Sequence, residues 1–331
     1  MSREHGPRGA RRRDRGVLIA ASVIALSLTA SGCVVVHGER EVLPATTRAE
    51  AATALQRFTT AYNKADQAYD PALYADETAG ALAAIDGARL RAGRKNNPGG
   101  NPNHTPLKLT DAKFTIPKKA GWPRWFVADA AGNKGGTARW LLVFVRNGLG
   151  EPWKVTYLTL VVPGTVPQFK KDKDGWAEAV PVNATGLAVP PGRLSQEYAT
   201  YLKSGGGTFA DGPHTSEWRK DRAKAAKRPG LVTQYVDEPL TSGAYAPLAL
   251  RTADGGALVF FATHHYEKQT AYPGTSVPEP TDAVLALTKG EIKQSLLMEL
   301  TSNEVALDPA KGKGKVSVLG RIQGLTTAQG S

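Results

Sequence analysis

The chain has 331 residues, a formal net charge of +12, 41% hydrophobic residues and a single cysteine. Charged residues make up 22% of it, and this balance excludes wholesale disorder and collagen-like repetition. One cysteine excludes an intrachain disulfide and a zinc site of the Cys₂His₂ or Cys₄ type. The length predicts two domains, each large enough to bury its own core.

The first 32 residues have the pattern of an export signal. Six arginines precede an uncharged apolar stretch over residues 17–30, and small residues follow it. The only cysteine comes next, at Cys33, where a bacterial lipobox has its lipidated cysteine, although Ala30 stands where a lipobox commonly has Leu. We therefore predict a signal peptide over 1–32, with a lipidated Cys33 and a tether over 33–45. The alternatives are an uncleaved signal anchor, because residues 17–36 are long enough to span a bilayer, and a freely secreted form.

Export changes what the basic charge means. Removal of residues 1–32 takes away six arginines and two acids, so that 36 basic residues remain against 28 acidic ones, a net charge of +8. A nucleic acid is a poor partner for a chain on the outer face of the plasma membrane, which is the location we predict. The expected partners are the membrane itself, through the lipid on Cys33, and anionic polymers of the cell envelope.

The first half of the mature chain predicts helices followed by strands. Thr47 and Glu50 form a capping-box pattern, and apolar residues then recur at helical spacing, so a helix is expected over 47–69. An Asp-Pro pair at residue 70 predicts the start of a second helix. A loop over 94–106 separates this helix from four strand-like runs.

The same order of elements is predicted again in the second half. Helices at 194–203 and 216–228 precede strand-like runs, among them an apolar run over 283–307, so an internal duplication is expected. We predict an α+β protein with two similar domains, each of N-terminal helices packed on a curved antiparallel sheet in a cone-like form. The predicted parts are a first domain over 46–165, a linker rich in Pro, Gly and Lys over 166–193, a second domain over 194–325 and a tail over 326–331.

Short motifs carry a resemblance to a known family. They are PRWF at residues 123–126, LLVFVRN at 141–147 followed by EPWKV at 151–155, and LRTADGGALVFFATHHYEK at 250–268. With them the mature chain resembles a family of uncharacterised actinobacterial surface lipoproteins of the Streptomyces type, which implies an exported lipoprotein and no assigned activity. The order of helices and sheet is similar to that of nuclear-transport-factor-2-like or cystatin-like domains, and that likeness implies a fold without implying a function.

Candidate pocket residues come from the polar end of one strand and from the tryptophans of the first sheet. His264 and Tyr266 fall on one face of the strand because side chains alternate, and an imidazole beside a phenol suits acid/base work or anion binding. Trp125 and Trp140 suit an aromatic-lined cavity. The alternative interpretation is a strand end that meets solvent and tryptophans that only pack in the core.

No complete catalytic motif, metal site or cofactor site is predicted from the sequence, so we expect a binding or envelope-associated module and not an enzyme. One alternative is an enzyme with a small-molecule cavity inside one α+β cone, with His104 as a further suspect beside His264 and Tyr266. A second alternative is a structural partner of another envelope protein. The basic helix from Trp218 to Arg228 favours either an anionic membrane surface or plain solvation.

Overall fold

Helices precede strands in both halves of the chain, so the predicted α+β class is confirmed. The computed structural model describes residues 41–331, and these form one compact unit. The predicted signal peptide, Cys33 and most of the tether lie outside the described residues. The α-helices are α1 (Arg48–Ala68), α2 (Gly80–Asn96), α3 (Leu194–Ser204), α4 (Ser216–Ala225) and α5 (Asp282–Leu287), with short 3₁₀ turns at η2 (Pro71–Tyr74), η3 (Pro191–Arg193) and η4 (Gly243–Tyr245).

Two antiparallel meanders build the two main sheets. The smaller sheet has four strands in the order β2-β4-β5-β6, and the larger has seven, with β12-β14-β13-β11-β9-β8 in a row and β10 paired to β11. Only β12 runs parallel to its neighbour in the large sheet. The strands of these sheets are β2 (Leu109–Thr115), β4 (Arg124–Gly132), β5 (Arg139–Arg146), β6 (Lys154–Val161), β8 (Lys227–Arg228), β9 (Leu231–Leu240), β10 (Leu248–Arg251), β11 (Ala257–Ala271), β12 (Thr288–Lys289), β13 (Ser295–Asp308) and β14 (Ser317–Gly330).

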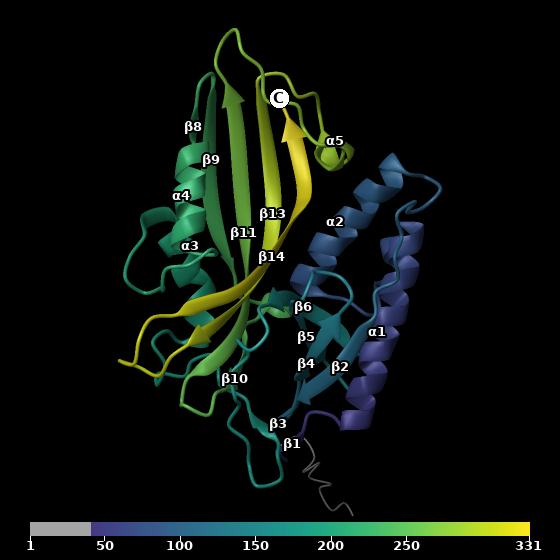
Figure 1. Cartoon of the computed structure of the whole chain (residues 1–331), viewed down its shortest axis with the longest axis vertical. Helices are drawn as coiled ribbons and strands as arrows, with labels where there is room; N and C mark the ends of the chain where they lie inside the picture. The colour runs from purple at the N-terminus through teal and green to yellow at the C-terminus, as the bar shows by residue number, and fades with distance from the viewer. Residues whose placement is uncertain (1–40) are drawn as a thin grey trace, which may run out of the picture. The chain divides into compact units, whose positions relative to one another are not determined.

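The sheets and helices stack in four layers (Figure 1). One core lies between α1 and the small sheet and contains Phe58, Phe126 and Phe144. A second core joins the small sheet to the large one, and a third lies between the outer face of the large sheet and α3. The side chain of Asn303 on β13 ties the sheets together, because its Oδ1 accepts the N–H of Leu158 on β6 at 2.9 Å.

Local sequence signals explain where the first helices begin. Thr47 caps α1, and its hydroxyl accepts the N–H of Glu50 at 3.1 Å. The expected second helix is split into η2 and α2, because the chain turns at Gly80, whose φ is +54°. A side chain at Gly80 would lie 2.3 Å from the carbonyl oxygen of Ala244, so only glycine fits this approach of α2 to η4.

The stretch over 166–193 packs against both sheets. It contains β7 (Ala177–Glu178), which joins β1 (Leu43–Pro44) and β3 (Pro117–Lys119) in a third, small sheet. Leu187 and Val189 are buried in the core beside α3. Two α-helices precede the main antiparallel strands on either side of this stretch, but the division into two similar domains and a linker stays a prediction.

Two segments near the C-terminus differ from the sequence prediction. The apolar run over 283–307 is not one strand: α5 forms first, since the Thr281 hydroxyl accepts the N–H of Val284 and caps it, and β13 begins only at Ser295. The last residues belong to β14, and Ser331 is bonded to Ser295 through its own N–H at 3.0 Å and its carbonyl at 2.7 Å. Strand β14 therefore runs to Gly330 and pairs with β13.

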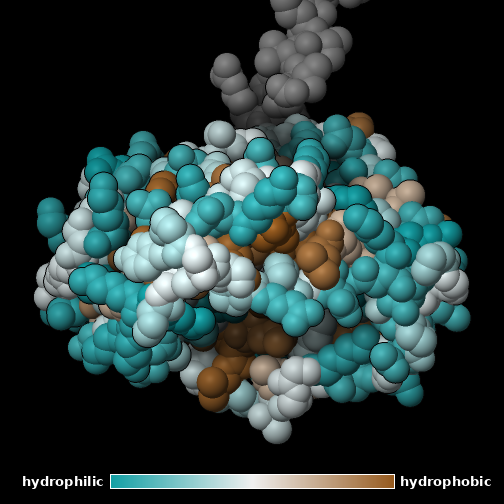
Figure 2. All heavy atoms as spheres, turned by 90° about the horizontal axis from the view of Figure 1, so that it is seen from above, coloured by the Kyte–Doolittle hydropathy of each residue, from teal (hydrophilic) through white to brown (hydrophobic). Residues whose placement is uncertain are grey.

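The end of the molecule that carries the tops of the long strands is recessed (Figure 2). Apolar side chains gather in the recess and hydrophilic ones surround it. Within residues 41–331 no helix is both long and apolar enough to cross a membrane.

Candidate functional site

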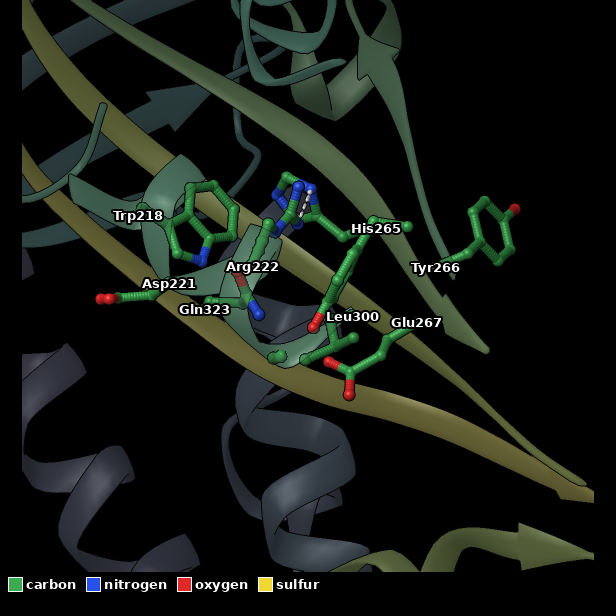
Figure 3. Close-up of a pocket in the computed structure, with 10 residues that line it drawn as sticks. Trp218, Asp221, Arg222, His265, Tyr266, Glu267, Leu300 and Gln323 are labelled. Atoms are coloured by element: carbon green, nitrogen blue, oxygen red, sulfur yellow. Dashed lines mark hydrogen bonds between the residues drawn. The ribbon is translucent and has the colours of Figure 1, made fainter. Parts of the chain in front are cut away.

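A pocket of about 190 Å³ lies between α4 and the face of the large sheet that this helix covers (Figure 3). Helix α4 supplies one wall and strands β9, β11, β13 and β14 supply the other. Its lining combines aromatic, basic, acidic and amide side chains. The lining residues are Trp218, Asp221, Arg222, Ala225, Tyr235, His265, Tyr266, Glu267, Leu300 and Gln323.

Periodicity brings these side chains to one place. Trp218 and Arg222 lie four residues apart on α4 and therefore share one face of the helix. Across the sheet, His265 on β11 is directly opposite Asp237 on β9 and Leu300 on β13, so these three side chains point to the same face. The pocket wall is thus fixed by the registers of three strands.

A chain of hydrogen bonds runs from the pocket into the protein. Arg222 Nη1 donates to both carboxylate oxygens of Asp237 at 2.8 Å. Asp237 Oδ1 lies 2.6 Å from Nδ1 of His265, whose Nε2 lies 2.9 Å from the hydroxyl of Thr263. The same hydroxyl lies 2.9 Å from Oε1 of Glu304, which is fully buried. Five side chains from four elements therefore form one continuous polar chain.

The proton inventory of this chain fixes its charge. The three bonds between Asp237, His265, Thr263 and Glu304 need three hydrogens, but a neutral imidazole and a hydroxyl supply only two. The third hydrogen is carried either by His265, as an imidazolium, or by the carboxyl of Glu304. Burial disfavours both charged forms: it lowers the pKa of His265 to about 4 and raises the pKa of Glu304 to about 7. The proton therefore belongs on Glu304 below about pH 7, with His265 neutral.

Asp237 stays ionised in this arrangement. Burial pushes its pKa up, but the hydrogen bond from His265 and the charge of Arg222 outweigh burial, and the pKa is lowered. Asp237 thus supplies the negative charge that holds Arg222 in place.

Two guanidinium groups cover the indole of Trp218. The Cζ atom of Arg222 lies 3.9 Å from the ring centroid and that of Arg321 lies 3.3 Å from it, while His265 meets the ring edge-on at 5.2 Å. Arg321 donates to the side-chain oxygen of Gln323 at 2.9 Å. No carboxylate of residues 41–331 forms an ion pair with Arg321. Burial lowers the pKa of the Arg321 guanidinium.

The pattern of acid, imidazole and hydroxyl is one that nucleophilic catalysis uses, but here the hydroxyl is out of reach. Thr263 is 0% exposed and is not among the residues that line the pocket. Its oxygen is held by His265 on one side and Glu304 on the other. We conclude that the chain stabilises the pocket wall and sets its charge. Among residues 41–331 there is no group of three or more His, Cys, Asp or Glu side chains placed to hold a metal ion.

The structure brings two of the predicted pocket residues together, and one of them, Tyr266, is among the residues that line this pocket. His264 and Tyr266 share a strand face, and their ring centroids are 4.5 Å apart. That face is opposite to the one carrying His265, and Figure 3 shows the Tyr266 ring turned away from the cavity. His104 is bonded to Asp66 at 2.9 Å, beside α1.

Trp125 and Trp140 lie on opposite faces of the small sheet and line no common pocket. Trp125 is 2% exposed and packs in the core between the two sheets. Trp140 is 6% exposed, packs in the core beneath α1 and donates its indole N–H to the carbonyl of Lys134. Trp218 of the basic helix faces the large sheet, where it meets Arg321 and His265.

The sequence interpretation missed Asp237, Thr263, Glu304 and Arg321. One signal was available for them. Charged or polar residues interrupt strands that otherwise read as buried, and a buried charge requires a partner. Which partner it meets depends on strand register, which the sequence pattern leaves open.

The relatives with similar sequences are named lipoproteins, and the matching family has no assigned function. The profile of the DUF8094 family, described as a domain of unknown function, matches residues 42–330. An uncharacterized lipoprotein of Streptomyces coelicolor is 72% identical over 330 residues, and one of Streptomyces avermitilis is 59% identical over 332 residues, with both chains fully covered in each case. A second uncharacterized lipoprotein of Streptomyces coelicolor is 29% identical over 213 residues, which cover 62% of this chain and 60% of that one. No solved structure matches.

Proposed function

This chain belongs to the DUF8094 family, and from its full-length lipoprotein relatives we propose that it is a lipid-anchored binding module on the outer face of the plasma membrane. The relatives support membrane anchoring at the cell surface. The position of the only cysteine, directly after an export signal, supports Cys33 as the lipidated residue.

The observation that carries the binding role is the pocket beneath α4. It is lined by side chains from α4, β9, β11, β13 and β14, and a buried hydrogen-bond chain fixes its wall. A hydroxyl aligned with an imidazole is present, but Thr263 is closed off from the cavity. This geometry favours holding a ligand over transforming one.

Fatty-acid labelling tests the anchor. Cys33→Ala in the full chain is expected to abolish incorporation of labelled palmitate and to leave an unprocessed precursor. Ser31→Ala is the matched control, since it keeps a small residue beside the cleavage site and should leave labelling unchanged. Unchanged labelling of Cys33→Ala would overturn the lipid anchor.

Trypsin treatment of intact cells tests the outer-face location. The loop over 311–315 carries three exposed lysines, at 311, 313 and 315, and offers accessible cleavage sites. We expect cleavage in intact cells, while a cytoplasmic marker protein stays whole. Protection of the loop in intact cells, with cleavage only after lysis, would contradict the proposed location.

A further inference from the structure

We propose that the pocket beneath α4 binds a small carboxylate ligand. This inference rests on the proposed binding role and adds the ligand class. Three features support it: uncommitted hydrogen-bond donors, an excess of buried positive charge, and the size of the cavity.

The pocket offers hydrogen-bond donors that no side chain of the described part of the chain uses. Trp218 makes no hydrogen bond with residues 41–331, and Figure 3 shows its indole nitrogen on the side that faces Arg222 and Gln323. Arg222 uses Nη1 for Asp237 and brings Nη2 within 3.5 Å of Nδ1 of His265, which leaves the Nε–H of its guanidinium available (Figure 3). The hydroxyl of Tyr235 also has no partner within the same residues. An acceptor with two oxygens, such as a carboxylate, satisfies several such donors at once.

The charges around the pocket favour an anion. Arg222 and Arg321 are both positive, and Asp237 is the only ionised carboxylate bonded to either of them among the described residues. Glu304 holds its proton below about pH 7, and His265 is neutral there. The charges of Arg222, Arg321 and Asp237 therefore sum to one positive unit, which a carboxylate bound beside the two guanidinium groups would balance.

The other groups that face the site refine the ligand. Burial and the nearby positive charge of Arg321 lower the pKa of His214. Asp221 is on the exposed rim and pairs with Lys224 at 3.6 Å. Glu267 faces the cavity and accepts a bond from Gln269 at 2.9 Å. The acidic Glu267 favours a ligand that also donates a hydrogen bond from the end opposite its carboxylate. A hydroxycarboxylic acid should therefore bind better than an unsubstituted carboxylic acid.

The cavity size sets the scale of the ligand. A volume of about 190 Å³ is below the range of pockets that hold drug-sized molecules. A polymer or a long acyl chain would have to leave most of its length outside. The pocket therefore suits a molecule of a few heavy atoms, or the end group of a larger one.

Thermal unfolding of the detergent-solubilised full chain tests the proposal. The probes are sodium acetate and sodium lactate, each compared at pH 6 with sodium chloride of equal ionic strength and with acetamide. At saturating concentration we expect acetate to raise the Tm by about 2 °C, lactate to raise it further, and acetamide to have no effect.

Two conservative variants and two matched controls test whether the acetate shift in Tm arises in the pocket. Trp218→Phe and Tyr235→Phe remove one donor each and should at least halve the acetate shift. Trp122→Phe and Tyr272→Phe lie outside the pocket and should keep the full shift. The proposal is overturned if acetamide stabilises as well as acetate, if acetate has no effect, or if the pocket variants keep the full shift. These results are independent of palmitate labelling, so failure of the ligand class and failure of the anchor can be told apart.

Discussion

His265 and Glu304 face one hydroxyl from two sides. Nε2 of the imidazole and Oε1 of the carboxyl each lie 2.9 Å from Oγ1 of Thr263. A hydroxyl donates only one proton, so His265 and Glu304 cannot both accept from it, and one of them must donate. The Thr263 hydroxyl thus links the protonation of a pocket-wall residue to that of a fully buried acid.

This link predicts that the stability of the protein falls as the pH rises. Burial raises the pKa of Glu304 from its ordinary value of 4.5 to about 7. The stabilisation from this carboxyl is fully present below about pH 4.5 and is lost as the pH rises through about 7. Across that window the free energy of unfolding should fall by roughly 3 kcal/mol through this residue.

Urea unfolding at pH 5 and pH 8 measures this dependence. Glu304→Gln keeps the shape and cannot ionise, so it should remove the part of the decrease that Glu304 causes. Asp308, whose pKa burial also raises to about 7, acts in the same direction, and Asp308→Asn serves as the comparison. An unchanged pH dependence in Glu304→Gln would contradict the assigned proton.

The ion pair of Arg222 with Asp237 should be important for stability. Their side chains are only 11% and 4% exposed. Asp237→Asn leaves Arg222 without a counter-charge and removes the charged partner of His265, and we expect a loss of about 3 kcal/mol in the free energy of unfolding. Asp221→Asn is the control, because its pair with Lys224 is 71% and 79% exposed and should matter by less than about 0.5 kcal/mol. Equal effects of the two substitutions in urea unfolding would refute this assignment.

Two glycines allow backbone strain and steric contact to be separated. Gly136 and Gly80 both have positive φ, +65° and +54°, but a side chain at Gly136 would meet nothing within 4 Å. Gly136→Ala should therefore cost about 1 kcal/mol of stability through strain alone. Gly80→Ala adds the contact with the Ala244 carbonyl and should cost about 3 kcal/mol. If thermal unfolding shows the same loss for both, α2 does not depend on this approach.

The amide of Asn303 should hold the two sheets together. It accepts from Leu158 N–H at 2.9 Å and donates to the Ile322 carbonyl at 3.3 Å, and the residue is 0% exposed. Asn303→Ala leaves two buried backbone groups unpaired and should cost roughly 3 kcal/mol. Asn147, which is exposed in a turn, is the matched control, and its replacement by Ala should change the midpoint of urea unfolding little. A small effect at Asn303 would mean that apolar packing alone joins the sheets.

The sequence pattern predicts the helices and strands of this fold better than it predicts which of them contact one another. The α1 helix and α3 agree closely with the prediction, because helical spacing and, for α1, the Thr47 cap are local signals. The α5 helix was missed, since its apolar residues also suit a strand and only the Thr281 cap distinguishes the two.

The candidate site was harder to predict, for a physical reason. Alternation correctly placed His264 and Tyr266 on one face of their strand, but both faces of β11 are covered along part of its length, so alternation alone favours neither face. The choice depends on Asp237 and Glu304, which are far apart in sequence and meet His265 and Thr263 only through the registers of β9 and β13.

The pairing of β14 with β13 has a consequence for the edge of the large sheet. Without β14, β13 would present fourteen residues of open edge that invite pairing with other chains. Arg321, Gln323 and the Ile322 carbonyl that accepts from Asn303 all belong to β14. The strand that protects β13 from aggregation thus also supplies Gln323 to the pocket wall.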